Sequence, residues 1–149
     1  MIKISIPVER HVHKYLEMRY GTQYVASKRS LLGLQVIQAL RSKYKKPLKK
    51  IPNFMEYAVE IPEHCLRTKK QAISKSNLLH LGICMGTLFD EDLCKYLDIQ
   101  VSQGKKALPE LKAWLTFHHI NENDVKVETL YKVYQRHCKG PIKAKKNVA

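Results

Sequence analysis

The sequence predicts a mostly α-helical protein with one small two-stranded antiparallel β ribbon. We expect a tandem β-α-α repeat followed by a C-terminal helical hairpin. The octapeptide SKRSLLGL at residues 27–34 returns as SKSNLLHL at residues 74–81, with five identical positions. An alternating strand pattern that stops at Ile-Pro precedes each copy, at residues 2–7 and 57–62. The hydrophobic fraction of 44% is enough to build a compact core around both copies.

The first repeat unit, residues 1–46, is predicted to open with a strand. Residues 2–7 alternate three isoleucines with Lys3 and Ser5, which is the period of a strand with one buried face. Pro7 lacks a backbone N–H group and therefore ends the hydrogen-bonded ladder. We expect the isoleucines in the core, and Lys3 and Ser5 on the outer face of the ribbon.

Two helices complete the first unit. Apolar residues at helical spacing predict a helix over residues 9–20, and Gly21 is a typical stop. Ser27 is then well placed as the N-cap of a second helix, which extends to about residue 44. Because this second helix is apolar around most of its circumference, we expect it at the centre of the core.

The second unit, residues 55–100, follows a Lys- and Pro-bearing connector and repeats the order of the first. Residues 57–61 form its strand, with alternate apolar side chains turned inward. A short helical piece covers residues 63–73, and Ser74 then caps a long apolar helix. We expect the strands of the two units to pair, because a strand with one apolar face is not stable alone.

The C-terminal part of the chain differs from both units. A helix is predicted over residues 107–119 and another from about 127 to 137, with a polar turn between them. We interpret this hairpin, residues 105–139, as a cover for an exposed side of the core. Residues 140–149 are interpreted as a basic tail. The whole chain, residues 1–149, has the length of a single domain.

Net charge is the strongest signal in the composition. The chain carries 27 lysine and arginine residues against 13 acidic ones, a formal charge of +14. Such an excess causes self-repulsion in the folded state, and a polyanionic partner is its commonest explanation. The most apolar run, residues 78–89, is too short to cross a bilayer. The sequence therefore predicts a nucleic-acid partner and no membrane partner.

The cysteines and the N-terminal residues indicate the cellular compartment in which the protein is expected. The N-terminal residues have neither the apolar run nor the cleavage pattern of a secretion signal. The four cysteines lie at irregular spacings, so we interpret them as reduced and mostly buried thiols. Both observations predict a cytoplasmic protein.

Sequence motifs for metal or enzyme chemistry are missing. His-Cys pairs occur at residues 64–65 and 137–138, yet no C-x-x-C or H-x-x-x-H spacing accompanies them. The three acids at 90–92 point different ways on a helix, and His11 and His13, two residues apart, do not face each other. No glycine-rich phosphate loop or nucleophile elbow is present. The sequence therefore predicts no enzyme, no metal and no cofactor.

A strand, a helix, and a second helix that begins with Ser and Lys resemble the ribbon-helix-helix family of DNA-binding proteins. The resemblance covers residues 2–44 and, in shortened form, 57–97. In that family two copies pair their strands into an antiparallel ribbon that enters the major groove, and the start of the second helix binds backbone phosphate. The resemblance implies a single-chain pseudodimer whose outward strand side chains face the bases.

The candidate DNA-binding residues lie on the ribbon and at the starts of the two long helices. At a helix start, free N–H groups, hydroxyls and cations converge, which favours phosphate. The same serines are also explained as ordinary N-caps that need no ligand. In this register Ala58 and Glu60 would face outward too, and Glu60 repels phosphate unless it accepts from cytosine. The candidates are Lys3, Ser5, Ser27, Lys28, Arg29, Ser30, Ser74, Lys75 and Ser76.

The function expected from the sequence is sequence- or structure-directed DNA binding, in a transcriptional or architectural regulator whose partner is duplex DNA. The alternative is a protein-binding accessory or assembly factor that docks through a basic face onto an acidic partner or a nucleoprotein complex. RNA is a further candidate ligand, although neither strand presents an aromatic platform for stacking bases. Whether the pseudodimer associates further is left open by the sequence.

Overall fold

The computed structural model describes three stretches of the chain, residues 1–41, 49–65 and 73–148. The chain divides into two compact units, Met1–Gly86 and Thr87–Ala149, each with its own buried side chains. Helix α3 (Lys75–Ser102) begins in the first unit and ends in the second.

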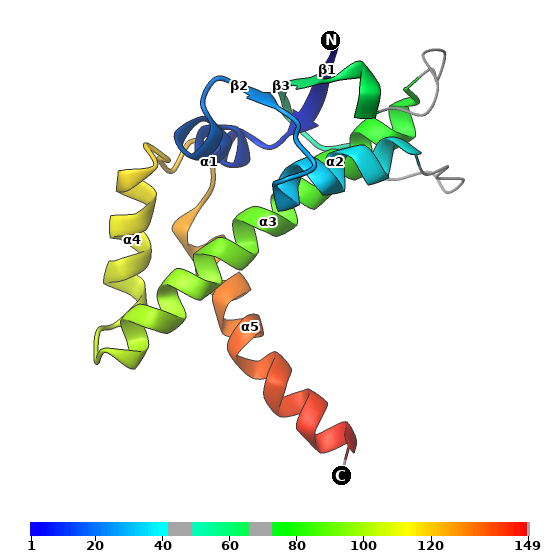
Figure 1. Cartoon of the computed structure of the whole chain (residues 1–149). Helices are drawn as coiled ribbons and strands as arrows, with labels where there is room; N and C mark the ends of the chain where they lie inside the picture. The colour runs from blue at the N-terminus through cyan, green and yellow to red at the C-terminus, as the bar shows by residue number, and fades with distance from the viewer. Residues whose placement is uncertain (42–48, 66–72, 149) are drawn as a thin grey trace. The chain divides into compact units, whose positions relative to one another are not determined.

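A three-stranded sheet is the centre of the first unit. Strands β1 (Ile2–Val8) and β3 (Met55–Ile61) are antiparallel, with Ile4 directly opposite Val59. The short strand β2 (Gln23–Val25) pairs with the other edge of β3 and runs parallel to it. The strand order is therefore β1-β3-β2 (Figure 1).

The pairing predicted between the strands near residues 2–7 and 57–62 is present, but the predicted fold class is wrong. The protein is mixed α/β with a three-stranded mixed sheet, and not a mostly α protein with a two-stranded antiparallel ribbon. β2 was missed because three residues are too few to display a period of two. Its pairing satisfies backbone groups on the second edge of β3 that need a partner.

The predicted tandem β-α-α repeat is also wrong. The first half contains β1, α1 (Arg10–Tyr20), β2 and α2 (Leu31–Arg41), whereas the second contains β3, a single 3-10 turn η1 (Glu63–Cys65), and α3. Most of the rest of the helical piece predicted over 63–73 lies outside the described residues. Fewer residues separate strand and octapeptide in the second half, which leaves no room there for counterparts of both α1 and β2.

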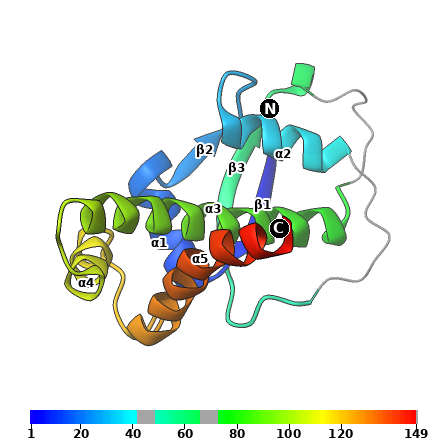
Figure 2. The same ribbon diagram turned by 90° about the horizontal axis from the view of Figure 1, so that it is seen from below.

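One face of the sheet is buried and the other is exposed. Along β1, Ile4, Ile6 and Val8 are buried, while Lys3 and Ser5 are exposed, as the alternation predicts. Helices α1, α2 and the start of α3 supply apolar side chains to the same core, and Figure 2 views the unit from the helix side. The buried residues that these helices contribute are Val12, Tyr15, Leu16, Leu32, Val36, Ile37, Ala39, Leu40, Leu81 and Met85.

Helix α3 passes close to the end of β1. A Cβ atom placed on Gly82 would lie 2.0 Å from the carbonyl oxygen of Pro7, which is well inside van der Waals contact. The helix can therefore approach the strand only because residue 82 has no side chain. Helix α2 runs alongside α3 in the opposite direction in both views (Figures 1 and 2).

The second unit is helical. The two helices predicted near the C-terminus are present as α4 (Ala107–Phe117) and α5 (Val127–Val148). Helix α5 continues through most of the stretch that was predicted as a basic tail, although Gly140 and Pro141 there disfavour a helix. Within the described part of the chain, no helix is long and apolar enough to cross a bilayer. The unit buries Phe89, Leu93, Leu97, Leu111, Trp114, Leu115, Ile120, Leu130 and Tyr134.

Candidate nucleic-acid interface

The positive charge is concentrated in the first unit. Met1–Gly86 contains sixteen lysine and arginine residues against five acidic ones, a net charge of +11. Thr87–Ala149 contains eleven against eight, a net charge of +3. Because a surface of one sign attracts polyanions, the first unit is the place to look for a nucleic-acid interface.

The first octapeptide forms a tight turn before α2. The backbone N–H of Arg29 donates to Ser27 Oγ at 3.1 Å, and that of Ser30 donates to the Ser27 carbonyl at 3.3 Å. The hydroxyl of Ser30 then accepts the N–H of Gly33 at 3.0 Å, so Ser30 is the N-cap of α2. The prediction of Ser27 as the cap is wrong, because Ser27 closes the preceding turn. Lys28 and Arg29 lie exposed at its tip.

The second octapeptide begins its helix three positions earlier. The hydroxyl of Ser74 accepts the backbone N–H of Asn77 at 3.1 Å, so Ser74 caps α3 as predicted. Lys75 and Ser76 consequently belong to the first turn of the helix, whereas their counterparts in the first copy precede α2. Asn77, which aligns with Ser30, is only 7% exposed and is not a cap.

The two groups of candidate residues are not brought together. Helices α2 and α3 run in opposite directions, so their N-terminal ends lie at opposite ends of the pair (Figures 1 and 2). Lys28, Arg29 and Lys75 are exposed, and among the described residues no acidic side chain pairs with them. The arrangement provides two separate cationic helix starts on one unit.

The outer face of the sheet carries the remaining candidates. Lys3 and Ser5 are exposed there as predicted, but Lys3 Nζ lies 3.6 Å from Glu60 Oε1 on the neighbouring strand. Glu56 is exposed on the same face. With one lysine and two glutamates along β1 and β3, this face repels phosphate more than it attracts it. The register with Ile4 opposite Val59 implies the Lys3–Glu60 pair, and the sequence prediction did not draw that consequence.

Arg41 has a structural role that the sequence did not reveal. Its Nη2 donates to the carbonyl oxygen of Cys65 at 2.7 Å, which ties the end of α2 to the end of η1. The sequence placed this arginine in a basic connector, and most of that connector, residues 42–48, lies outside the described residues. Lys49 and Lys50, which follow it, are exposed.

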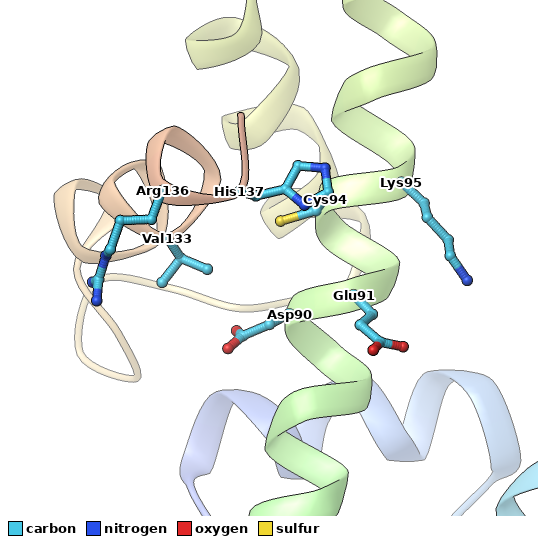
Figure 3. A pocket seen from close by; sticks show the side chains of 7 residues that line it. All are labelled: Asp90, Glu91, Cys94, Lys95, Val133, Arg136 and His137. Atoms are coloured by element: carbon cyan, nitrogen blue, oxygen red, sulfur yellow. The ribbon is translucent and has the colours of Figure 1, made fainter. Parts of the chain in front are cut away.

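The second unit contains an open pocket of about 700 Å³ between α3 and α5 (Figure 3). Beside it, Asp98 accepts hydrogen bonds from His137 Nε2 at 2.7 Å and from the Tyr134 hydroxyl at 3.2 Å. Burial and the charges of nearby Asp90 and Asp98 raise the pKa of the Cys94 thiol to about 11. The lining residues are Asp90, Glu91, Cys94, Lys95, Val133, Arg136 and His137.

The thiol in this pocket lacks the low pKa of a catalytic cysteine. A thiol with a pKa near 11 stays protonated at neutral pH, so Cys94 is not an activated nucleophile despite the nearby His137–Asp98 pair. In the described residues, no three potential ligands are grouped closely enough to hold a metal ion. We therefore assign no reaction to the pocket.

Compared with protein-family models, curated proteins and solved structures, the chain shows no significant match. The resemblance to ribbon-helix-helix proteins therefore remains a prediction from the sequence pattern.

Proposed function

We propose that the protein binds duplex nucleic acid, with DNA as the first choice, through phosphate contacts made by its basic first unit. The observation that carries the proposal is the net charge of +11 in Met1–Gly86, with exposed cations at both helix starts. Free backbone N–H groups at a helix start add to the attraction of nearby lysine or arginine for phosphate.

Phosphate contacts are favoured over base reading as the main source of affinity. The outer face of the sheet contains Glu56 and Glu60, and Glu60 pairs with Lys3. Lys28, Arg29 and Lys75 lack such acidic neighbours among the described residues. Binding of this kind suits an architectural or regulatory protein that depends more on duplex shape than on sequence. A cytoplasmic location belongs to the same proposal and is supported by four free cysteines.

Charge reversal tests the proposal directly. The variant K28E/R29E/K75E is compared with K105E/K106E/K112E, which makes the same change in formal charge on exposed lysines of the second unit. Fluorescence anisotropy with a 20-base-pair duplex at 50 mM salt should show a loss of about 10- to 100-fold for the first variant. The control should lose much less, because its residues are not in the proposed interface.

Salt dependence gives a second criterion. If about six phosphates are contacted, the affinity of the unmodified protein should fall about 10³-fold between 50 and 200 mM salt. Equal losses in the two charge-reversal variants, or no duplex binding at 50 mM salt, would contradict the proposal. Single strands and duplex RNA in the same series decide which nucleic acid is preferred.

An acidic protein partner is the second candidate. Its supporting observation is that Leu31 and Leu34, on α2 next to Arg29, are 69% and 47% exposed. Apolar side chains beside a cation contribute to protein interfaces more than to phosphate contacts. The variant L31S/L34S should leave duplex affinity unchanged if nucleic acid is the ligand. The protein partner is favoured if the unmodified protein does not bind the duplex but binds an acidic polypeptide, and if L31S/L34S weakens that binding.

A further inference from the structure

We propose that Cys94 on α3 and Cys138 on α5 are a redox pair that forms a reversible intramolecular disulfide in the second unit. The proposal is independent of nucleic-acid binding. Both residues are free thiols in the structure, and they differ in access, because Cys94 is 4% exposed and Cys138 is exposed.

The contacts between the two helices place the cysteines on facing sides. Asp98 on α3 is hydrogen-bonded to both Tyr134 and His137 on α5, so these residues mark the sides that face each other. Cys94 lies one helical turn before Asp98, and Cys138 lies one turn after Tyr134. Residues four apart share a helix face, so each cysteine projects toward the other helix.

The direction of the two helices places the cysteines at the same level. Cys94 lines the pocket together with Arg136 and His137 (Figure 3). Asp98, one turn later on α3, accepts hydrogen bonds from His137 and also from Tyr134, which lies one turn before Cys138 on α5. The contacts therefore progress in opposite directions along α3 and α5. Cys94 lies one turn before Asp98 on α3, and Cys138 lies one turn after Tyr134 on α5. One turn away from the Asp98–Tyr134 contact, the two cysteines are therefore at the same level.

Electrostatic neighbours agree with this placement. Burial, the carboxylates of Asp90 and Asp98, and then Cys138 raise the pKa of the Cys94 thiol. Burial and a hydrogen bond with Cys138, followed by the contact with Asp98, raise the pKa of the Tyr134 hydroxyl. Cys138 is thus in contact with Tyr134 and close enough to Cys94 to affect its ionisation.

The proposed oxidation uses hydrogen peroxide as the oxidant. The thiolate of the exposed Cys138 attacks the peroxide, an S–O bond forms, the O–O bond breaks, and hydroxide leaves and becomes water by taking a proton. The Cys94 thiol then attacks the resulting sulfenic sulfur and gives its proton to the sulfenic oxygen, so that an S–S bond forms, the S–O bond breaks, and a second water leaves. Two thiols and one peroxide thus give one disulfide and two waters, with two electrons passing from sulfur to oxygen.

The test uses the full chain with Cys65→Ser and Cys84→Ser, which leaves only the proposed pair. After peroxide treatment and alkylation with N-ethylmaleimide, intact mass should show a protein lighter by two hydrogen atoms that carries no label. Peptide mapping should join the segments containing Cys94 and Cys138, and dithiothreitol should restore two labelled thiols. The unmodified chain, mapped in the same way, gives the answer even if the double variant does not fold.

Single-cysteine controls make the outcome decisive. Cys94→Ser should stop at a sulfenic or more oxidised Cys138, and Cys138→Ser should leave Cys94 reduced because it is buried. The proposal is overturned if both thiols remain labelled, if Cys138 is oxidised to sulfinic acid without joining Cys94, or if only disulfides between two chains form.

Discussion

The two copies of the octapeptide, residues 27–34 and 74–81, share five residues and yet begin their helices at different points. In the first copy the hydroxyl of Ser30 accepts a hydrogen bond from the backbone three residues later, and in the second Ser74 has that role. A short sequence match therefore specifies that a helix starts nearby, but it does not specify which serine caps the helix.

A neighbour outside the octapeptide accounts for the difference. In the first half, the Tyr24 hydroxyl on β2 is hydrogen-bonded to the Ser30 hydroxyl. The second half has no counterpart of β2 among its described residues. Ser27 is meanwhile occupied in a turn, whose backbone packs against Gly33. Contacts made by the rest of the first unit thus select Ser30 as the cap.

The largest expected effect comes from the seventh position of the octapeptide, which is Gly33 in the first copy and His80 in the second. A Cβ atom on Gly33 would lie 2.0 Å from the Ser27 carbonyl oxygen. Gly33→Ala should therefore lower the free energy of unfolding by about 2–3 kcal/mol, because the clash exceeds the gain in helix propensity. His80→Ala should cost less. Urea denaturation of both variants measures the comparison, and equal costs would contradict it.

Strand β3 contains a buried ionisable side chain, Tyr57, and strand β1 does not, so the stability of the fold should depend on alkaline pH through β3. Tyr57 at the start of β3 is fully buried, and its hydroxyl donates to the Gly21 carbonyl at 2.8 Å. Burial first, and then the charges of Glu17 and two tyrosines, raise its pKa to about 12. Because the folded state holds this proton more tightly, its contribution is complete below pH 10 and is lost as pH rises from 10 to 12.

The expected loss of stability over that range is about 2 kcal/mol. Ile2 opens the equivalent strand and has no ionisable group, so Tyr57→Phe is the suitable control. Denaturant unfolding at pH 9, 10 and 11 should show a steeper decline for the unmodified protein than for Tyr57→Phe. Parallel declines would mean that this tyrosine does not contribute the pH dependence.

The caps themselves give an intermediate effect. Ser30→Ala should lower the free energy of unfolding by about 1 kcal/mol, because the N–H of Gly33 loses its partner. Asn77→Ala, at the aligned position, should be nearly neutral, since Asn77 is not a cap and its buried Oδ1 has no hydrogen-bond partner among the described residues. Thermal unfolding of both variants tests this, and a larger cost for Asn77→Ala would show that the helix starts were assigned wrongly.

The smallest expected effects concern single cations in duplex binding. Lys28→Ala and Lys75→Ala should each reduce the slope of log affinity against log salt by about 0.9, if each lysine neutralises one phosphate. Lys3→Ala should change the slope less, because Lys3 already pairs with Glu60. Anisotropy titrations at four salt concentrations measure the slopes. An equal or larger change for Lys3→Ala would place the interface on the sheet.

Much of the local structure was accessible from the sequence. The alternation in residues 2–7 and 57–61 correctly predicted which side chains are buried, except that Ile2 is only half-buried, and the two strands pair as expected. The helices predicted over residues 9–20 and 107–119 were also correct to within two residues, as α1 (Arg10–Tyr20) and α4 (Ala107–Phe117). Helix α5, in contrast, extends to Val148, well beyond its predicted end near residue 137. These features depend on a repeat of two or 3.6 residues, which the sequence displays directly.

The candidate site was accessible only in part. Lys28, Arg29 and Lys75 could be found because an exposed cation beside a helix start needs no distant partner. The ion pair of Lys3 was not anticipated, although the strand register implies it, and neither was the hydrogen bond of Arg41 to Cys65. Each of these side chains interacts with a residue that is distant in the sequence.

The sequence by itself determined where the main helices and the two long strands form, and which of their faces are buried, because those properties follow from local spacing. Tertiary structure alone decided that β2 joins the sheet, that Ser30 and not Ser27 caps α2, and that Asp98 on α3 binds Tyr134 on α5. The physical reason is that a three-residue strand, a choice between two caps and a hydrogen bond between two helices each depend on neighbours that are distant along the chain.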